Sequence, residues 1–253
     1  MGILEISKCT KKFGGLVAVK DLNMSLNAGD LYGLIGPNGA GKTTIFNLIT
    51  GVYAPDEGSI LLDGQAIHGR RPSAIAALGM SRTFQNIRLF QSMTVLENVK
   101  LARHMRKRQG LLDAILRTPA LQDEEREVEA DALELLKIFH LDDRAHELAK
   151  NLPYGSQRRL EIARALATKP KVLLLDEPAA GMNPQESLEL MRLIQWARDE
   201  FQITILLVEH NMQVVMGVCE KIQVVDYGET IALGTPREIQ DHPKVIEAYL
   251  GGA

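Results

Sequence analysis

The sequence predicts an α/β fold in which a mostly parallel β-sheet is accompanied by a small N-terminal antiparallel β-subdomain and an inserted α-helical subdomain. Short apolar strands alternate with helical segments in both halves of the chain, and this alternation favours parallel strands joined by crossover helices. Between about residues 94 and 149 the apolar residues instead recur at helical spacing. The length of 253 residues fits one large domain or two small ones and allows a substantial core.

The first part of the chain is rich in strands. Its apolar residues alternate with polar ones or form compact runs, and glycine and aspartate mark the turns between them. We expect strands at residues 3–10, 17–26, 31–35 and 79–84 and a hairpin at residues 59–67. One helix, from Lys42 to Thr50, should follow the third strand and end at Gly51.

The middle of the chain has the pattern of amphipathic helices, with a loop near residues 109–112 and a break at Pro119. Its apolar residues define one buried face: Val128, Ala132, Leu135, Leu136 and Phe139. Its acidic residues are expected on the solvated face: Asp123, Glu124, Glu125, Glu127 and Glu129. Its basic residues are interpreted as a solvated helix end, with a binding patch as the alternative: Arg103, Arg106, Lys107 and Arg108.

The last part of the chain returns to strands alternating with helices. We expect helices at residues 155–169 and 184–200 and strands at 171–175, 203–208, 221–225 and 230–233. The chain is therefore expected to form a single domain over residues 1–253. Its core should span residues 1–85 and 165–253, and its helical subdomain residues 86–164.

Composition narrows the possible partners. The 29 basic and 32 acidic residues give a net charge of -3, which offers no electrostatic reason to expect nucleic acid. Cys9 and Cys219 lie far apart in apolar surroundings, so we interpret them as reduced core thiols of a cytosolic protein. The N-terminus lacks the pattern of a signal peptide, and no apolar run of roughly 18 residues could span a bilayer. Any role at a membrane would require a partner.

Residues 36–43, GPNGAGKT, match the pattern G-x-x-x-x-G-K-[ST] between a strand and a helix. The glycines let the backbone curl until its N–H groups converge on phosphate oxygens, and the helix N-terminus adds positive potential. We expect Lys42 to reach the β- and γ-phosphates of ATP and the Thr43 hydroxyl to bind Mg²⁺. The nucleotide-binding residues of this phosphate loop are Gly36, Asn38, Gly39, Gly41, Lys42, Thr43 and Thr44. A chance glycine turn is the alternative, and the flanking strand and helix argue against it.

Two carboxylates end an apolar strand at Asp176 and Glu177. Charges in this position are costly unless they meet a cation or polarise water. We expect Asp176 to hold Mg²⁺ through water and Glu177 to orient and deprotonate the attacking water. In the alternative interpretation both residues cap the next helix.

With these motifs in this order, the chain resembles over its whole length the nucleotide-binding subunit of an ABC transporter, a P-loop NTPase. The resemblance implies that Phe13 stacks on adenine, with an ordinary core position as the alternative. Gln85 matches the family's Q-loop glutamine, which joins the metal and the attacking water to the transporter-facing surface. His210 matches the switch histidine that contacts the γ-phosphate, with a solvated surface histidine as the alternative.

Residues 152–160, LPYGSQRRL, correspond to the family's signature loop, usually LSGGQ. The resemblance implies that this loop closes over ATP held by a second cassette, with Gly155 and the helix N-terminus offering N–H groups. Pro153 replaces a serine that donates a hydroxyl, Ser156 replaces the glutamine, and Asn183 stands where an aspartate is common. Losing one charge-assisted hydrogen bond is worth roughly 1.5–3 kcal/mol, which predicts slower turnover or more work for the partner's site.

Several segments resemble the cassettes of bacterial uptake systems for branched-chain amino acids, including FGGLVAV, RTFQNIRLF, MTVLENV and the tail GTPREIQDHPKVIEAYLG. The resemblance implies an ATPase that pairs with a second cassette, identical or not, and with membrane permeases at the cytoplasmic face of the plasma membrane. A binding protein outside the membrane would be an indirect partner. Cassettes for urea or short amides, for lipopolysaccharide export, or without a transporter are the alternatives.

Overall fold

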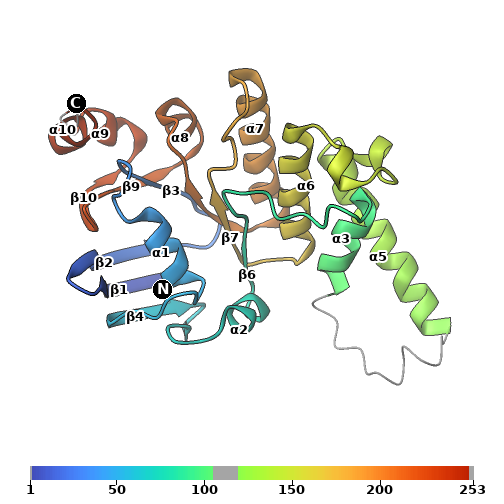
Figure 1. Cartoon of the computed structure of the whole chain (residues 1–253), viewed down its shortest axis with the longest axis horizontal. Coiled ribbons are helices and arrows are strands. Elements are labelled where there is room, and N and C mark those ends of the chain that lie inside the picture. The colour runs from blue at the N-terminus through green and yellow to red at the C-terminus, as the bar shows by residue number, and fades with distance from the viewer. Residues whose placement is uncertain (1, 105–118, 251–253) are drawn as a thin grey trace. The chain divides into compact units, whose positions relative to one another are not determined.

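The computed structural model describes residues 2–104 and 119–250, and the chain divides into two compact units (Figure 1). The core unit contains the residues up to Arg82 and those from Lys171 onward, and the helical unit contains Thr83–Pro170. These break points differ by a few residues from the expected ones. As a result Gln85, expected at the end of a core strand, belongs to the helical unit.

A six-stranded sheet forms the centre of the core unit. Its strands are β3 (Leu31–Ile35), β6 (Met80–Arg82), β7 (Val172–Asp176), β8 (Thr204–Val208), β9 (Lys221–Asp226) and β10 (Glu229–Gly234). The strand order is β10-β9-β3-β8-β7-β6, with β9 and β10 antiparallel and the other neighbours parallel. Strands β3, β7 and β8 are buried at every residue, which explains their continuous apolar sequences.

The register of the parallel strands brings their carboxyl ends to one edge. Leu34 of β3 pairs with Val208 of β8, and Val208 pairs with Asp176 of β7. The loops that leave the sheet at this edge carry the glycine-rich motif and the paired carboxylates. The topology therefore places the segments that were singled out in the sequence on one side of the sheet.

A four-stranded antiparallel sheet packs with helix α1 (Lys42–Ile49) against one face of the central sheet. Its strands, in the order β2-β1-β4-β5, are β2 (Leu16–Leu26), β1 (Leu4–Phe13), β4 (Glu57–Leu62) and β5 (Gln65–Ala66). A single hydrophobic cluster joins these elements and includes Leu4, Leu22, Phe46, Leu34 and Leu174. Because α1 is held by this cluster, the loop that precedes it is fixed at both ends.

Helices α7 (Pro184–Phe201) and α8 (Met212–Val218) cover the other face of the central sheet, opposite β1, β2 and β4 (Figure 1). A Cβ atom on Gly33 would lie 3.1 Å from both Cys219 Sγ and Val215 Cγ1, so the missing side chain lets α8 approach β3 closely. Burial raises the pKa of the Cys219 thiol to about 12 and that of Cys9 to about 11. Both cysteines are buried and free, as the sequence predicted.

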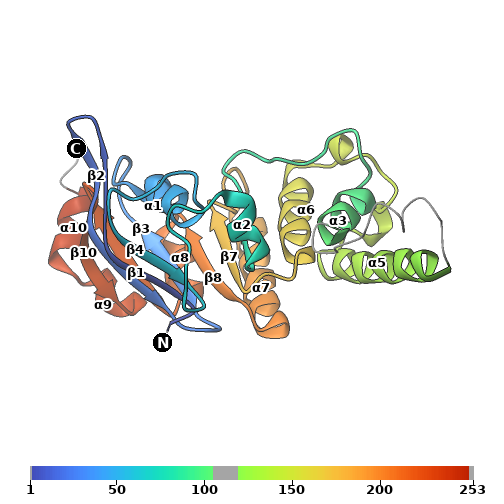
Figure 2. The ribbon, with the colours of Figure 1, turned by 90° about the horizontal axis from the view of Figure 1, so that it is seen from below.

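The helical unit contains α3 (Val95–His104), α5 (Pro119–Ile138) and α6 (Tyr154–Ala167), and Figure 2 shows α3 beside α5. Four of the five apolar residues predicted on the buried face of α5 are buried: Val128, Ala132, Leu136 and Phe139. Two short 3-10 turns, Asp142–Arg144 and Ala149–Asn151, lead to α6. Arg103 pairs with Asp131 at 2.8 Å, whereas the other three residues of the suggested basic patch lie outside the described residues.

Several short helices were not predicted. They are α2 (Pro72–Ala77), α8, α9 (Pro236–Gln240) and α10 (Pro243–Leu250), each of five to eight residues. Segments this short show too few turns for a helical period to emerge. One signal was available, because Thr235 and Glu238 form a capping box at the start of α9. None of the helices described here is long and apolar enough to cross a membrane.

Asn183 caps α7, and this gives a testable prediction. Its side chain accepts a hydrogen bond from the Glu186 N–H at 2.9 Å, and the Glu186 carboxylate accepts one from the Asn183 N–H at 3.0 Å. Replacing Asn183 by Ala should lower the free energy of unfolding by about 1 kcal/mol in urea denaturation. Asn183→Asp keeps a capping oxygen and should stay near the wild type. Equal stability of all three proteins would contradict this role.

Candidate nucleotide site

The phosphate loop runs from the end of β3 to the first turn of α1. Gly41 is the N-cap residue of α1 and has a φ of 100°, a left-handed conformation that glycine adopts at little cost. Glycine supplies no capping side chain, so the positive end of α1 is available to an anion. The buried Lys42 ammonium donates to the carbonyl oxygens of Gly36 and Pro37 at 2.7 and 2.8 Å. An ammonium beside a helix N-terminus is the arrangement that binds phosphate.

Neighbouring backbone segments hold the loop closely. A Cβ atom on Gly36 would lie 2.0 Å from the Val225 carbonyl oxygen, and one on Gly41 would lie 2.6 Å from the Ala18 carbonyl oxygen. The turn between β9 and β10 also donates an N–H to the Ala40 carbonyl at 3.0 Å. The loop is thus packed backbone to backbone, which explains why glycine is needed at these two positions.

Glu177 and His210 lie together at the same edge of the sheet. The Glu177 N–H donates to the Val208 carbonyl at 2.8 Å, and Glu177 has a φ of 49°. Residues other than glycine rarely adopt this left-handed conformation, and such backbone strain is concentrated at functional sites. Glu177 Oε1 and His210 Nε2 are 2.5 Å apart. Neither Asp176 nor Glu177 caps the following helix, because Asn183 does so.

Arg82, which the sequence analysis did not single out, holds Asp176. Its Nη2 donates to Asp176 Oδ2 at 2.9 Å, and both side chains are 8% exposed. Its Nη1 donates to Asn47 Oδ1 of α1 at 2.7 Å, and its guanidinium lies 5.3 Å from the centre of the Phe46 ring. The carboxylate at the end of the apolar strand therefore meets a cation, as its burial requires. The pairing depends on the parallel register of β6 with β7, which sequence alone does not display.

The donors at this edge suit a Mg²⁺ ion that is shared with phosphates. In the described part of the chain, no three or more His, Cys, Asp and Glu side chains gather as a metal site. Mg²⁺ typically keeps several waters and takes one or two protein oxygens together with substrate phosphates. Thr43 in the first turn of α1 and Asp176 at the end of β7 are oxygen donors of that kind.

Glu209 is a second residue that was not assigned a role. Its buried carboxylate accepts hydrogen bonds from the N–H groups of Ala179 at 2.8 Å and His210 at 3.2 Å. Burial raises the pKa of Glu209, and these two N–H groups oppose the rise. Glu209 therefore ties the segment after Glu177 to the segment that carries His210. Its place directly after a buried strand was the only signal in the sequence.

Phe13 lies at the end of β1 and is 42% exposed, so it does not occupy an ordinary core position. Its ring meets Tyr53 edge to face, with centroids 5.2 Å apart, and the Lys11 ammonium lies 5.5 Å from its centre. Phe13 pairs with Leu16 across the hairpin, and the same hairpin contacts the phosphate loop through Ala18. An accessible aromatic ring on a hairpin that touches the phosphate loop is suited to stacking on a base.

Gln85 and Gly155 belong to the helical unit. Gln85 lies three residues beyond the end of β6, and its side chain is exposed. Gly155 is the second residue of α6, whose N-cap residue Pro153 makes no side-chain capping bond. Helix α6 starts at an exposed tyrosine, Tyr154, and Gly155 beside it is half-buried.

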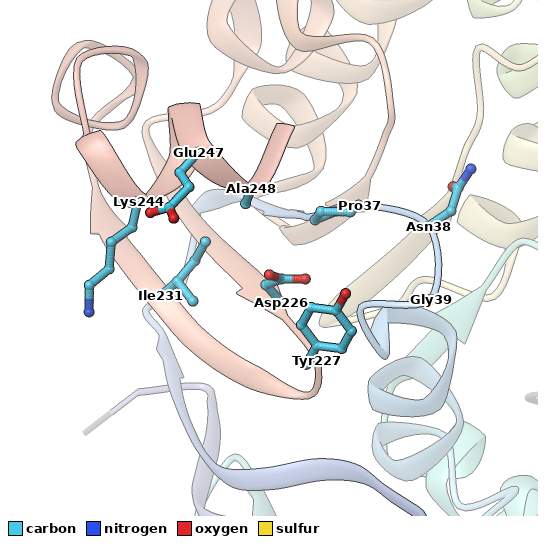
Figure 3. Close-up of a pocket in the computed structure, with 9 residues that line it drawn as sticks. All are labelled: Pro37, Asn38, Gly39, Asp226, Tyr227, Ile231, Lys244, Glu247 and Ala248. Carbon is cyan, nitrogen blue, oxygen red and sulfur yellow. The ribbon is translucent and has the colours of Figure 1, made fainter. Parts of the chain in front are cut away.

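A pocket of about 720 Å³ lies beside the phosphate loop, between the β9–β10 turn and α10 (Figure 3). It is lined by Pro37, Asn38, Gly39, Asp226, Tyr227, Ile231, Lys244, Glu247 and Ala248. Three residues of the phosphate loop, Pro37, Asn38 and Gly39, are among these lining residues, so the pocket adjoins the loop. Burial raises the pKa of the Tyr249 phenol in α10 to about 12, and a hydrogen bond from the Gly36 N–H opposes the rise. The C-terminal helix thus contacts the first residue of the loop.

A glycine-rich loop that leads into a helix N-terminus, together with paired carboxylates at the end of a parallel strand, is typical of P-loop ATPases. Comparison with known proteins agrees with this class. The model of the family described as ABC transporter matches residues 19–180. The chain belongs to this family of ATP-hydrolysing transporter subunits. A second family model, described as branched-chain amino acid ATP-binding cassette transporter, matches residues 229–253.

Curated relatives and solved structures match along almost the whole chain. The chain is 47% identical over 251 residues to the high-affinity branched-chain amino acid transport ATP-binding protein LivG of Escherichia coli strain K12, covering 99% of this chain and 98% of that protein. It is 35% identical, with the same coverage, to the lipopolysaccharide export system ATP-binding protein LptB of that strain. An ATP-binding cassette of an ABC transporter in its ADP conformation has a TM-score of 0.85 at 32% identity and covers 99% of both chains. Another cassette, solved as a dimer in a post-hydrolysis state, has a TM-score of 0.78 at 26% identity, covering 92% of this chain and 99% of that one.

The tight packing at Gly36 gives a second prediction. In Gly36→Ala the new methyl group would meet the Val225 carbonyl oxygen at 2.0 Å, so the loop must move out of its cradle. We expect equilibrium binding of a fluorescent ATP analogue to weaken by at least roughly tenfold, the loss that about 1.4 kcal/mol represents.

Gly217→Ala is the matched control for this test. A Cβ atom on Gly217 meets nothing within 4 Å, and the residue lies in α8, where alanine is favoured over glycine. Its binding should equal that of the wild type. If Gly36→Ala also bound the analogue normally, the loop geometry described here would be wrong.

Proposed function

We propose that this chain is the ATP-hydrolysing motor subunit of an importer for branched-chain amino acids. The identity of 47% to LivG over almost the full length supports this proposal most strongly. The match of the C-terminal residues 229–253 to a family described by the same substrate class supports it independently. The relative described as serving lipopolysaccharide export is more distant, at 35% identity.

The residues at the sheet edge fit the steps of ATP hydrolysis. The phosphate loop and the α1 N-terminus bind the β- and γ-phosphates, with Lys42 as their cation and Phe13 stacked on the adenine. Glu177 accepts a proton from the attacking water, and His210 holds the Glu177 carboxylate and contacts the γ-phosphate. Mg²⁺, held by Thr43, Gln85 and Asp176, would neutralise the charge that develops on the phosphates.

The active form would be a head-to-tail pair of cassettes. Gly155 and the α6 N-terminus of one chain would close over ATP held by the phosphate loop of the other. The second cassette is either a copy of this chain or a related chain, and the relative solved as a dimer supports the pairing. Permease subunits would carry the substrate, so the pair would work at the cytoplasmic face of the plasma membrane, with an external binding protein as an indirect partner.

The assignment of Glu177 as general base can be tested by Glu177→Gln. Removing the base should lower steady-state ATP hydrolysis by about 10²–10⁴-fold while ATP binding persists, because the phosphate loop is untouched. The variant should also accumulate as a closed dimer in size-exclusion chromatography with MgATP. Glu134→Gln, an exposed residue of α5, is the matched control and should turn over normally. Unchanged turnover in Glu177→Gln would overturn the assignment.

The transport assignment is tested by purifying the tagged chain from its native membranes in mild detergent. We expect two hydrophobic permeases and a second cassette to be recovered with it. The recovered complex, reconstituted in vesicles, should take up leucine, isoleucine or valine with ATP. Uptake of urea or short amides instead would contradict the proposed substrate class and assign the chain to the cassettes that serve urea or short amides. Recovery of ribosomes or DNA-associated proteins without permeases would refute the transport role and leave the ATPase activity.

A further inference from the structure

The helical unit contains a buried ion pair that takes no part in the proposed steps of ATP hydrolysis. Arg158 and Glu161 lie one turn apart on α6, and each side chain is 2% exposed. Arg158 Nη1 donates to Glu161 Oε2 at 3.1 Å. Burying two charges is costly unless further hydrogen bonds satisfy them. The other partners of this pair therefore indicate what it holds in place.

Those partners include the backbone of the Q-loop, defined here as residues 83–91. Arg158 Nη1 donates to the Phe84 carbonyl at 2.8 Å, and Nη2 donates to the Gln85 carbonyl. Glu161 Oε1 accepts a hydrogen bond from the Arg88 N–H at 3.2 Å. Two buried side chains thus fix three backbone groups of one exposed loop.

The same guanidinium also reaches the start of the signature helix α6. Arg158 Nε and Nη2 donate to the Tyr154 hydroxyl at 3.2 and 3.0 Å. Tyr154 is the first residue of α6 and is adjacent to Gly155. Arginine is planar and presents its donors in a fixed fork, so it cannot shift toward one partner without leaving another. Arg158 is therefore a rigid link between the Q-loop and the first turn of α6.

We propose that Arg158 is a positioning residue that couples the two ATP sites of a cassette pair. This inference rests on the proposed function, in which Gln85 serves the ATP of its own chain and Gly155 serves the ATP of the partner. A change in the Q-loop backbone at one site is passed through Arg158 to the signature loop at the other. Occupation of one site then changes the affinity of the second, which is a coupling between sites.

The test compares three variants in the full-length chain. Arg158→Lys keeps the charge beside Glu161 but loses the fork, so it cannot bind both Q-loop carbonyls and Tyr154 together. Arg126→Lys is the matched control, because the Arg126 side chain is 79% exposed and, among the residues that the structure describes, forms an ion pair with the exposed Asp123. Arg158→Met combined with Glu161→Met removes both buried charges and supplies a variant that folds if the lysine variant does not.

The first measurement is hydrogen–deuterium exchange without nucleotide, followed by mass spectrometry. In Arg158→Lys, peptides covering residues 83–91 and 152–160 should both exchange roughly tenfold faster than in the wild type, the effect of losing one or two hydrogen bonds. The double variant should show the same change, and Arg126→Lys should show none. Unchanged exchange in both Arg158 variants would overturn the link itself.

The second measurement is the ATP dependence of hydrolysis. The wild type should give a Hill coefficient above 1 and the Arg158 variants about 1, while the affinity of each full-length variant for a fluorescent ATP analogue stays within about twofold of the wild type. A Hill coefficient equal to that of the wild type, with exchange accelerated, would show that Arg158 is only structural and would overturn the coupling. Absence of hydrolysis in the wild type itself would instead refute the proposed function, and the coupling with it.

Discussion

The parallel strands β3, β8 and β7 end at the same edge of the central sheet, and the residues that follow them place several charged side chains close together. Burial lowers the pKa of the Lys42 ammonium, and the nearby carboxylates of Glu177 and Asp176 oppose that shift. Asp176 is in turn paired with Arg82. The register that aligns Leu34, Val208 and Asp176 brings these charged groups together. The chemistry of the site therefore depends on the pairing of β3, β8 and β7.

The functional residues are divided between the two units. The phosphate loop, Glu177 and His210 belong to the core unit, whereas Gln85 and Gly155 belong to the helical unit. In each unit a buried arginine holds the functional residues of that unit in place: Arg82 in the core unit and Arg158 in the helical unit. Because each of these arginines bonds to more than one element, each holds a functional segment in a defined place rather than adding stability alone.

Sequence reasoning found the features that are local in the chain. The phosphate loop, the buried strands β3, β7 and β8 and the amphipathic face of α5 can be read from consecutive or periodic residues. It missed Arg82, Glu209 and Arg158, because their roles depend on contacts between segments far apart in the chain. It also assigned Gln85 to the core, because a strand was expected at residues 79–84. In the structure this strand, β6, already ends at Arg82. Sequence reasoning treated Asn183 as the loss of an aspartate's charge, whereas the structure shows that its side chain caps helix α7.

In our interpretation this chain holds a nucleotide mainly through its phosphates. Titration calorimetry of the full-length chain with ATP, ADP and AMP is the decisive measurement. We expect the affinity to fall sharply from ADP to AMP, because Lys42 and the α1 N-terminus act on the β- and γ-phosphates. Lys42→Ala should remove most of the difference in affinity between ATP and AMP. Binding of AMP as tightly as ATP by the wild type would refute recognition through the phosphates.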